Sequence, residues 1–192
     1  MILKSLKYII CIIGLISIMP VLLIISILIL IEDGFPIIYK QSRLGINQSN
    51  FTIYKLRTMK KNSPQIATHE VSSKYFLRIG HFIRKTKLDE FPQLFNILIG
   101  DLNFVGPRPG MASIISLVEE RERFDVYSVK PGITGLSQIL GFDMSKPTDL
   151  AAVDKIYIEN QSIRLDLIIL SGTFFRYPKR YIAKEFQIEC DV

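Results

Sequence analysis

The sequence is poor in the residues that build disulfides and metal centres. It contains two cysteines and two histidines in 192 residues. Cys11 lies inside an apolar run and Cys190 lies near the end of the chain, so no bridge between them is expected, and a reducing compartment fits better. His69 and His81 add too few ligands for a zinc site of the Cys/His type. Walker and GxGxxG nucleotide-binding loops are also missing from the sequence.

Basic residues outnumber acidic ones, but they are not gathered into one tract. The chain carries 24 Lys and Arg against 18 Asp and Glu, a formal net charge of +6. Because there is no long basic tract and no RNA-binding aromatic signature, nucleic acid is not an expected partner. The charge instead suits an anionic bilayer surface or phosphorylated small molecules. The length is sufficient for one globular core and short for two.

A long apolar run near the N-terminus predicts a membrane helix. Tyr8 to Ile31 contains no charged residue and exceeds the roughly 20 residues that a spanning helix needs. Pro20, near its middle, removes a backbone hydrogen bond and is expected to bend the helix. Basic residues stand on both sides of the run, and such residues mark the cytosolic side. From the residues alone, a spanning helix and a bent helix that re-enters the same leaflet both remain open.

The segment after this run predicts a β-hairpin. Two short β-rich stretches flank the turn-forming residues 45–50, and Lys55 lies on the second stretch. The simplest interpretation of such a lysine is a solvated basic edge of the hairpin.

Three later segments have simple structural interpretations. Residues 119–124 (EERERF) predict a charged helix face, and residues 130–135 (KPGITG) predict a type II turn with a positive φ at Gly132. Residues 163–184 alternate apolar and basic groups, a pattern that suits a helix in a bilayer interface. A buried core helix explains the apolar half of that segment equally well.

The most informative stretch is LDEFPQLFN, residues 88–96, which places two adjacent acids beside several cations. Thr86 and Asp89 have the spacing of a capping box, so Asp89 and Glu90 are predicted in the first turn of a helix that ends near Ile99. Acids in that position commonly offset the helix dipole and do nothing else. Their neighbours favour a functional role, since Arg84 lies just upstream.

A second cation is placed for phosphate binding. In GPRPG, prolines on both sides hold Arg108 on a stiff, extended backbone. A rigidly held guanidinium can grip a phosphate through two parallel hydrogen bonds. Phosphoryl transfer from a diphosphate needs such cations, or a metal, to neutralise the substrate. Mg²⁺ binds one or two carboxylates together with substrate phosphates, and an ionised carboxylate can attack phosphorus.

Three blocks of sequence carry a family resemblance: IYKLRTM, then RKTKLDEFPQLFNILIGDLNFVGPRP, then KPGITGLSQ. In this order they resemble the bacterial sugar transferases known as small monotopic phosphoglycosyl transferases. The resemblance extends from the N-terminal run to residues 165–167. It implies an enzyme on the cytosolic face of the bacterial inner membrane that moves a sugar 1-phosphate from a UDP-sugar to undecaprenyl (polyprenyl) phosphate and releases UMP. Such enzymes begin capsule, exopolysaccharide, O-antigen or glycoprotein glycan synthesis, so downstream glycosyltransferases are expected partners.

The resemblance also implies roles for individual residues. Asp89 corresponds to the nucleophile, which forms a covalent phosphosugar intermediate and takes part in binding Mg²⁺, and Glu90 assists it. Arg84 and Arg108 correspond to phosphate-contacting arginines. Lys55 corresponds to the lysine of the family's YK-RTM block, and the resemblance implies that it also binds substrate phosphate.

The membrane segment of the family is a re-entrant helix bent at a proline, which corresponds to Pro20 and favours re-entry here. Many members have Ser before that proline, whereas this chain has Met19. The sharpness of the bend is therefore not fixed by the sequence.

These observations predict an α+β fold that is mainly helical. We expect a proline-bent re-entrant helix at residues 1–33, and a compact cytosolic, membrane-associated catalytic domain at 34–192 with a small β-hairpin and amphipathic interfacial helices. Two other functions are compatible with the charge and the apolar segments. One is a non-catalytic scaffold bound to anionic lipid, and the other is a glycosyltransferase that moves sugar without its phosphate and releases UDP.

Overall fold

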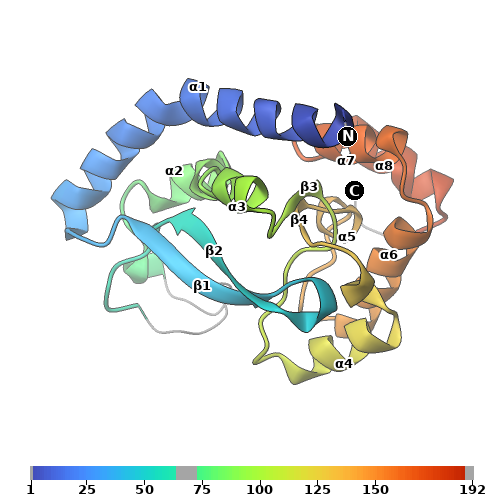
Figure 1. Ribbon diagram of the computed structural model, residues 1–192. Helices are drawn as coiled ribbons and strands as arrows, with labels where there is room; N and C mark the ends of the chain where they lie inside the picture. Colours follow the sequence, from blue (N-terminus) through green and yellow to red (C-terminus); the bar gives the residue numbers. More distant parts are fainter. Residues whose placement is uncertain (1, 64–72, 189–192) are drawn as a thin grey trace. The chain divides into compact units, whose positions relative to one another are not determined.

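Helices dominate the computed structural model, which describes residues 2–63 and 73–188 and also contains two small sheets (Figure 1). The mainly helical α+β fold predicted from the sequence is therefore confirmed. The chain divides into two compact units, described separately below. Unit 1 comprises Met1–Gln41 with Ile53–Ile99, and unit 2 comprises Ser42–Thr52 with Gly100–Val192.

The helices and strands of the first hundred residues run in the following order: α1 (Ile2–Asp33), β1 (Ile38–Leu44), the 3-10 helix η1 (Ile46–Gln48), β2 (Asn50–Leu56), the 3-10 helix η3 (Ser73–Tyr75), α2 (Gly80–Lys85), the 3-10 helix η4 (Leu88–Glu90) and α3 (Gln93–Ile99). The pairing of β1 with β2 confirms the predicted hairpin. Gly100 has a φ of +92°, which confirms the predicted stop at the end of α3.

The remaining elements are β3 (Asn103–Val105), α4 (Ile115–Arg123), the 3-10 helix η5 (Val126–Ser128), β4 (Gly132–Thr134), α5 (Leu136–Ile139), α6 (Pro147–Glu159), α7 (Ile163–Gly172) and α8 (Arg176–Glu185). Strands β3 and β4 are parallel, with Asn103 opposite Gly132 and Val105 opposite Thr134.

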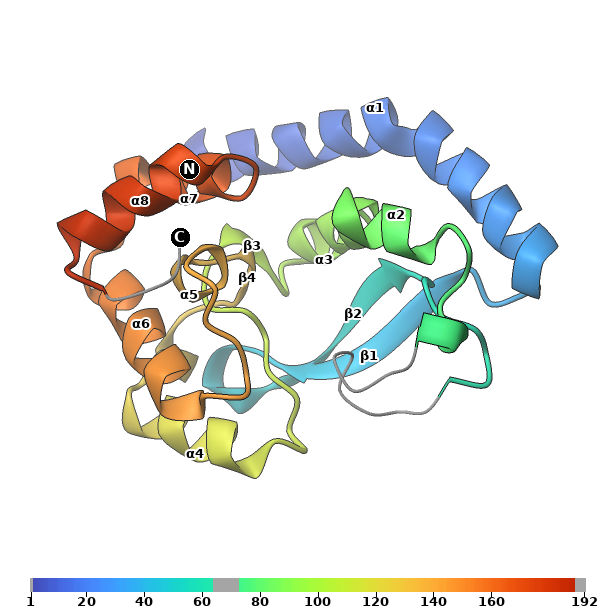
Figure 2. The ribbon, with the colours of Figure 1, turned by 180° about the vertical axis from the view of Figure 1, so that it is seen from behind.

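Helix α1 lies along unit 1 and does not extend away from it. In both views it curves alongside α2 and α3 (Figures 1 and 2). At Gly14, a Cβ atom would lie 3.4 Å from Leu94 Cδ1 of α3. Ile25 and Ile29 belong to a buried cluster with Leu56, Leu77 and Ile83. Contact from Gly14 to Ile29 covers about 22 Å of helix at 1.5 Å per residue.

The rest of the α1 surface is apolar and exposed. Residues 6–33 form a helix that is long and apolar enough to cross a membrane, judged by length and composition. Helix α1 continues through Pro20 without interruption. Its exposed large apolar side chains are Leu6, Tyr8, Ile9, Ile10, Ile12, Ile13, Ile16, Met19, Val21, Leu23, Ile24, Ile27, Leu28, Leu30 and Ile31. An apolar surface of this extent marks a contact with lipid or with another apolar partner.

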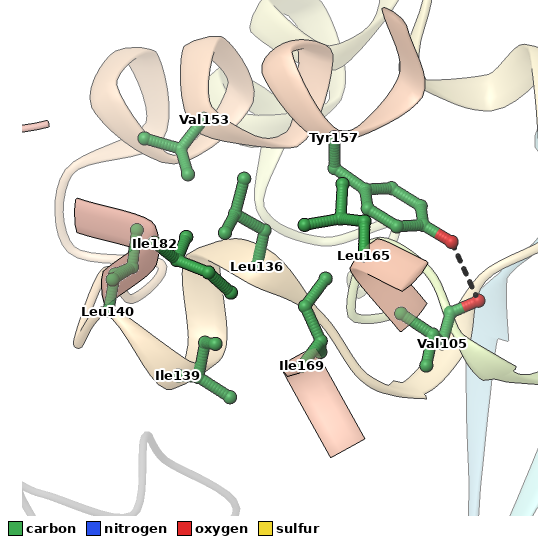
Figure 3. Packing of buried hydrophobic residues seen from close by; sticks show 9 residues of the cluster. All are labelled: Val105, Leu136, Ile139, Leu140, Val153, Tyr157, Leu165, Ile169 and Ile182. Carbon is green, nitrogen blue, oxygen red and sulfur yellow. Dashed lines mark hydrogen bonds between the residues drawn. The ribbon is translucent and has the colours of Figure 1, made fainter. Parts of the chain in front are cut away.

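The core of unit 2 is built from β3 and the helices that follow β4. Figure 3 shows nine buried side chains from these elements: Val105, Leu136, Ile139, Leu140, Val153, Tyr157, Leu165, Ile169 and Ile182. The Tyr157 hydroxyl lies 3.4 Å from the Val105 carbonyl oxygen and donates a bond of 2.9 Å to Asp166. This buried hydroxyl thus links α6 to β3 and to the first turn of α7.

The predicted turn at residues 130–135 is wrong. Gly132 does not have a positive φ; it opens strand β4 and pairs with β3. A Cβ atom at this position would lie 2.2 Å from Gly106 N and 2.6 Å from Val105 C. Gly132 is therefore required by the close approach of two backbones and not by a turn.

We expect Gly132→Ala to destabilise the protein by about 3 kcal/mol, since the added methyl group forces the β3 and β4 backbones apart. Thermal unfolding in detergent measures this change. Gly14→Ala is the control, because a Cβ added there would meet only Leu94 Cδ1, at an ordinary contact distance of 3.4 Å. A Gly132 variant as stable as the wild type would contradict the packing described here.

Candidate active site

The two adjacent acids lie in a tight turn between α2 and α3. They occupy the 3-10 helix η4, and α3 begins only at Gln93, so the predicted position in the first turn of that helix is wrong. The capping box is also wrong, because the Thr86 hydroxyl donates backwards to the Phe82 carbonyl at 2.8 Å. Lys87 turns the chain with a left-handed φ of +57°. The turn buries Asp89, whose exposed fraction is 9%.

Lys55 of β2 bonds directly to the second acid. Its Nζ lies 2.9 Å from Glu90 Oε1, and the side chains are 16% and 14% exposed. Lys55 is therefore half-buried in an ion pair, and the simple interpretation as a solvated edge residue is wrong. The pair occupies Glu90, so the two acids differ in their surroundings.

Arg84 is held beside the acids by two side chains of unit 1. Its Nε donates to Thr58 Oγ1 at 2.8 Å. Its Cζ lies 4.9 Å from the centroid of the Phe76 ring, within the range of a cation–π contact. The charges of Asp89 and Glu90 act on this guanidinium and oppose the lowering of its pKa by burial.

Burial raises the pKa of Asp89 above its ordinary value. The positive charge of Lys55 opposes this shift, the negative charge of Glu90 adds to it, and the charge of Arg84 again opposes it. A carboxylate in an apolar environment is poorly solvated and hence reactive, provided that neighbouring cations keep it ionised. Lys55 and Arg84 supply those cations.

Helix α3 buries its polar side chains together with Ile97 and exposes other apolar side chains. Gln93 and Asn96 of α3 are buried, as is Asp89 in the turn before it. Asn96 Oδ1 accepts a bond from Tyr54 N at 3.3 Å. On the other side, Phe95 and Ile99 are 48% and 52% exposed. A helix in contact with water usually exposes its polar residues, so the exposed Phe95 and Ile99 on the helix after the acids are unusual.

Arg108 lies in unit 2, where its backbone and its side chain are both held. Arg121 Nη1 donates to the Arg108 carbonyl at 2.7 Å. Arg108 Nη1 lies 2.5 Å from the side-chain oxygen of Gln138, in the amide orientation that satisfies both Gln138 polar atoms. Arg108 is thus held both through its carbonyl oxygen and through its guanidinium.

Arg121 belongs to a buried ion pair. Its Nη2 lies 2.7 Å from Asp154 Oδ2, and the two side chains are 2% and 1% exposed. Ser137 donates to the other Asp154 oxygen at 2.6 Å. The prediction of a solvated charged face for residues 119–124 is therefore wrong for Arg121, which points into the core beside Leu117.

The acid pair fits a magnesium ion only if the substrate supplies ligands. Among the described residues there is no group of three or more His, Cys, Asp or Glu that could hold a metal. Mg²⁺ does not require such a cage, since it binds one or two carboxylates together with water and substrate phosphates. Asp89, whose neighbour Glu90 already holds Lys55, is the carboxylate that fits this role.

Of the residues predicted from the sequence, Lys55, Arg84, Asp89 and Glu90 lie together in unit 1, and Pro20 lies in α1 of the same unit. Arg108 belongs to unit 2.

The sequence interpretation missed the groups that position these residues. Thr58 holds Arg84, and Arg121 with Asp154 holds the backbone of Arg108. Arg121 could have been noticed, because it follows Leu117 by four residues and so lies on the apolar side of α4.

Residues 1–180 match the family described as bacterial sugar transferase. The chain belongs to this family. One related member is the UDP-N-acetylgalactosamine-undecaprenyl-phosphate N-acetylgalactosaminephosphotransferase of Aeromonas hydrophila, which is 34% identical over 80% of this chain. Another is the exopolysaccharide production protein ExoY of Sinorhizobium fredii, 33% identical over 88% of this chain. A third is the UDP-glucose:undecaprenyl-phosphate glucose-1-phosphate transferase of Klebsiella pneumoniae, 35% identical over 84% of this chain.

These family members differ in length from the chain described here. The match covers 82% of ExoY, but only 38% of the Aeromonas protein and 37% of the Klebsiella protein. The chain thus spans little more than a third of the length of two of these relatives. The residues that match the family, 1–180, contain the turn with Asp89 and Glu90.

Proposed function

We propose that this sugar transferase moves a sugar 1-phosphate from a UDP-sugar to undecaprenyl phosphate and releases UMP. The observation that carries the proposal is the buried Asp89, placed near Lys55 and Arg84 in a member of this family. The names of the Aeromonas and Klebsiella relatives describe the same class of reaction. The apolar α1 and the family together indicate membrane association, as a lipid acceptor requires.

In the first step, an Asp89 carboxylate oxygen attacks the phosphorus that carries the sugar. The new bond is an acyl phosphate, and the bond between that phosphorus and the bridging oxygen breaks, with its electron pair leaving on UMP. Arg84 neutralises charge on the diphosphate. Arg108 corresponds, by the family resemblance, to a second phosphate-contacting arginine.

In the second step, a phosphate oxygen of undecaprenyl phosphate attacks the same phosphorus. The bond to Asp89 breaks, the carboxylate is regenerated, and the product is a diphosphate that joins lipid and sugar. Glu90, held by Lys55, assists Asp89 through its negative charge, which raises the pKa of Asp89 and makes that carboxylate more basic. Bound Mg²⁺, held by Asp89 and the substrate phosphates, would supply further neutralisation of negative charge.

The released nucleotide tests this function. Purified protein, a panel of UDP-sugars and undecaprenyl phosphate should yield UMP and a lipid diphosphate sugar. A glycosyltransferase that leaves the phosphate on the nucleotide would release UDP. A lipid-bound scaffold would release no nucleotide from any UDP-sugar while still binding anionic vesicles. Either result would contradict the proposal.

Re-entry of α1 at the cytosolic face is part of the same proposal. The long contact between α1 and the rest of unit 1, from Gly14 to Ile29, supports it, because a helix that crosses the bilayer alone could not also lie along a cytosolic body. Cysteines introduced at the N-terminus and at Lys60 should both be labelled from inside the cell. Labelling of the N-terminus only from outside would show that the helix spans.

Lys55 should set the acidic limb of the pH–rate profile. Its charge favours the ionised form of Asp89, so in Lys55→Met the pKa of Asp89 rises further. Activity requires the ionised form and is lost as pH falls through this pKa. We therefore expect the acidic limb of kcat/KM against pH to move to higher pH in Lys55→Met and to stay close to that of the wild type in Lys55→Arg. If the acidic limb of the profile stayed at the same pH in Lys55→Met, the charge of Lys55 would not be what lowers the pKa of Asp89.

A further inference from the structure

Thr58 occupies a fixed place beside the arginine of the active-site turn. Residues 58–60 run against residues 75–77: Leu77 N donates to Thr58 O at 3.1 Å, and Lys60 N donates to Tyr75 O at 2.8 Å. Met59 and Phe76 form an antiparallel bridge between these bonds. The backbone of Thr58 is thereby tied to the segment that leads directly into α2.

The first residue of α2 packs against the same backbone. A Cβ atom at Gly80 would lie 2.3 Å from the Thr58 carbonyl oxygen, so only glycine permits this approach. Arg84 lies four residues further along α2, about one helical turn from Gly80. The distance between the Thr58 side chain and the Arg84 backbone is therefore set by backbone contacts and not by flexible side chains.

The residue before Thr58 anchors the segment on its other side. Arg57 is 6% exposed and donates to the Asp33 carboxylate at the end of α1. It also donates to the carbonyl oxygens of Gly34 and Pro36, at 2.5 Å and 2.6 Å. Thr58 is thus held by backbone bonds to residues 75–77 and by its neighbour to the end of α1.

We propose that Thr58 is a positioning residue that, with Phe76, orients the Arg84 guanidinium toward the substrate diphosphate. The Thr58 hydroxyl accepts from Nε, and the Phe76 ring covers one face of the group. These contacts fix the plane of the guanidinium and direct the edge formed by its two terminal nitrogens. That edge is the one that binds two phosphate oxygens at once. Thr58 itself does not touch the substrate.

This inference rests on the proposed function, because the diphosphate is the ligand of Arg84 only in that reaction. Two measurements separate the role of Thr58 from the proposed function. UMP release by the wild type tests the function, and binding of UDP, measured by calorimetry without any lipid acceptor, tests the grip of Arg84 on a diphosphate. If the wild type released no UMP, the function would fail, whereas the UDP affinities of the variants would still decide the role of Thr58.

Three variants test the role of the Thr58 hydroxyl. Thr58→Val keeps the shape and removes the acceptor, Thr58→Ser keeps the acceptor, and Thr86→Val removes a hydroxyl at the exposed end of α2. We expect Thr58→Val to lose about 10- to 100-fold in kcat/KM and to bind UDP more weakly, because a small misplacement of a positioned group costs this much. Thr58→Ser and Thr86→Val should stay within about threefold of the wild type.

The Arg84→Lys background shows whether Thr58 acts through Arg84. Lysine has no Nε–H fork for the hydroxyl to orient, so adding Thr58→Val to Arg84→Lys should cost less than about twofold more, since the two effects share one interaction. Wild-type activity and UDP affinity in Thr58→Val would overturn the inference. So would a loss that persists in full in the Arg84→Lys background, because Thr58 would then act on something else.

Discussion

Asp89→Asn will lower UMP release from UDP-sugar by at least about 10³-fold, because the amide cannot attack phosphorus and no second nucleophile replaces a lost one. The measurement is single-turnover release of UMP, which reports the first step without the lipid acceptor. Glu90→Gln should lose less, since Glu90 is bonded to Lys55 and does not form the covalent bond.

Asp89→Asn should be as stable as the wild type or more stable. The pKa of Asp89 is raised in the folded protein, so the cost of its ionisation to folding is absent at low pH and is present in full above the folded pKa. At neutral pH, asparagine removes that cost. Thermal unfolding of Asp89→Asn should therefore occur at an equal or higher temperature.

A matched control is Asp125→Asn, because Asp125 lies outside the active-site turn. Asparagine tolerates the φ of +55° at Asp125. It makes the same chemical change away from the acid pair and should release UMP at the wild-type rate. Turnover by Asp89→Asn at the rate of this control would rule out Asp89 as the nucleophile.

Asp154→Ala will destabilise the protein by about 3–5 kcal/mol, the usual cost of leaving one member of a buried ion pair without its partner. Arg121 is 2% exposed, and the carboxylate of Asp154 is the opposite charge that balances its guanidinium. Burial raises the pKa of Asp154, and the charge of Arg121 and the bond from Ser137 oppose that shift. Denaturant unfolding in detergent measures the loss.

Two further variants make this test specific. Replacing both partners, with Arg121→Met and Asp154→Leu, should recover much of the lost stability, since no buried charge is left uncompensated. Glu120→Ala breaks a pair of 3.8 Å whose arginine is 72% exposed, and it should change stability by less than about 1 kcal/mol. An Asp154→Ala protein within that same small range would mean that the buried pair does not hold α4 against α6.

Local patterns predict the hairpin and the end of α3 correctly, because both depend on nearby residues. Alternating β-rich stretches around a turn specify β1 and β2. Gly100 ends α3 through its own positive φ. The capping box fails because Thr86 has two acceptors within its own helix, at Phe82 and Ile83, and uses those. Spacing alone does not show in which direction a hydroxyl will bond.

Longer-range partners account for the other errors. Pro-Gly is a turn signal, but the pairing of Gly132 with β3 involves residues nearly thirty positions away. Arg121 stands among charged residues that predict a solvated face, but its partner Asp154 lies 33 residues further along the chain.

The acid pair and its cations can be predicted because their residue types and order carry the chemistry. Asp89, Glu90, Arg84 and Lys55 are all indicated by the sequence, and the structure places them together in unit 1. The sequence does not indicate Thr58, because its proposed role comes from a bond to a residue 26 positions away. The residues proposed to act on the substrate are thus indicated by the sequence, whereas the contact between Thr58 and Arg84 becomes visible only in the folded chain.

The mass of the tryptic peptide that begins at Leu88 tests the central proposal most directly. The protein should be incubated with UDP-sugar and no lipid acceptor, quenched in acid, digested and weighed. We expect this peptide to gain the mass of one sugar phosphate on Asp89, and to lose it when undecaprenyl phosphate is added. An unchanged peptide mass, in a reaction that has released one UMP per enzyme, would contradict a covalent intermediate on this aspartate.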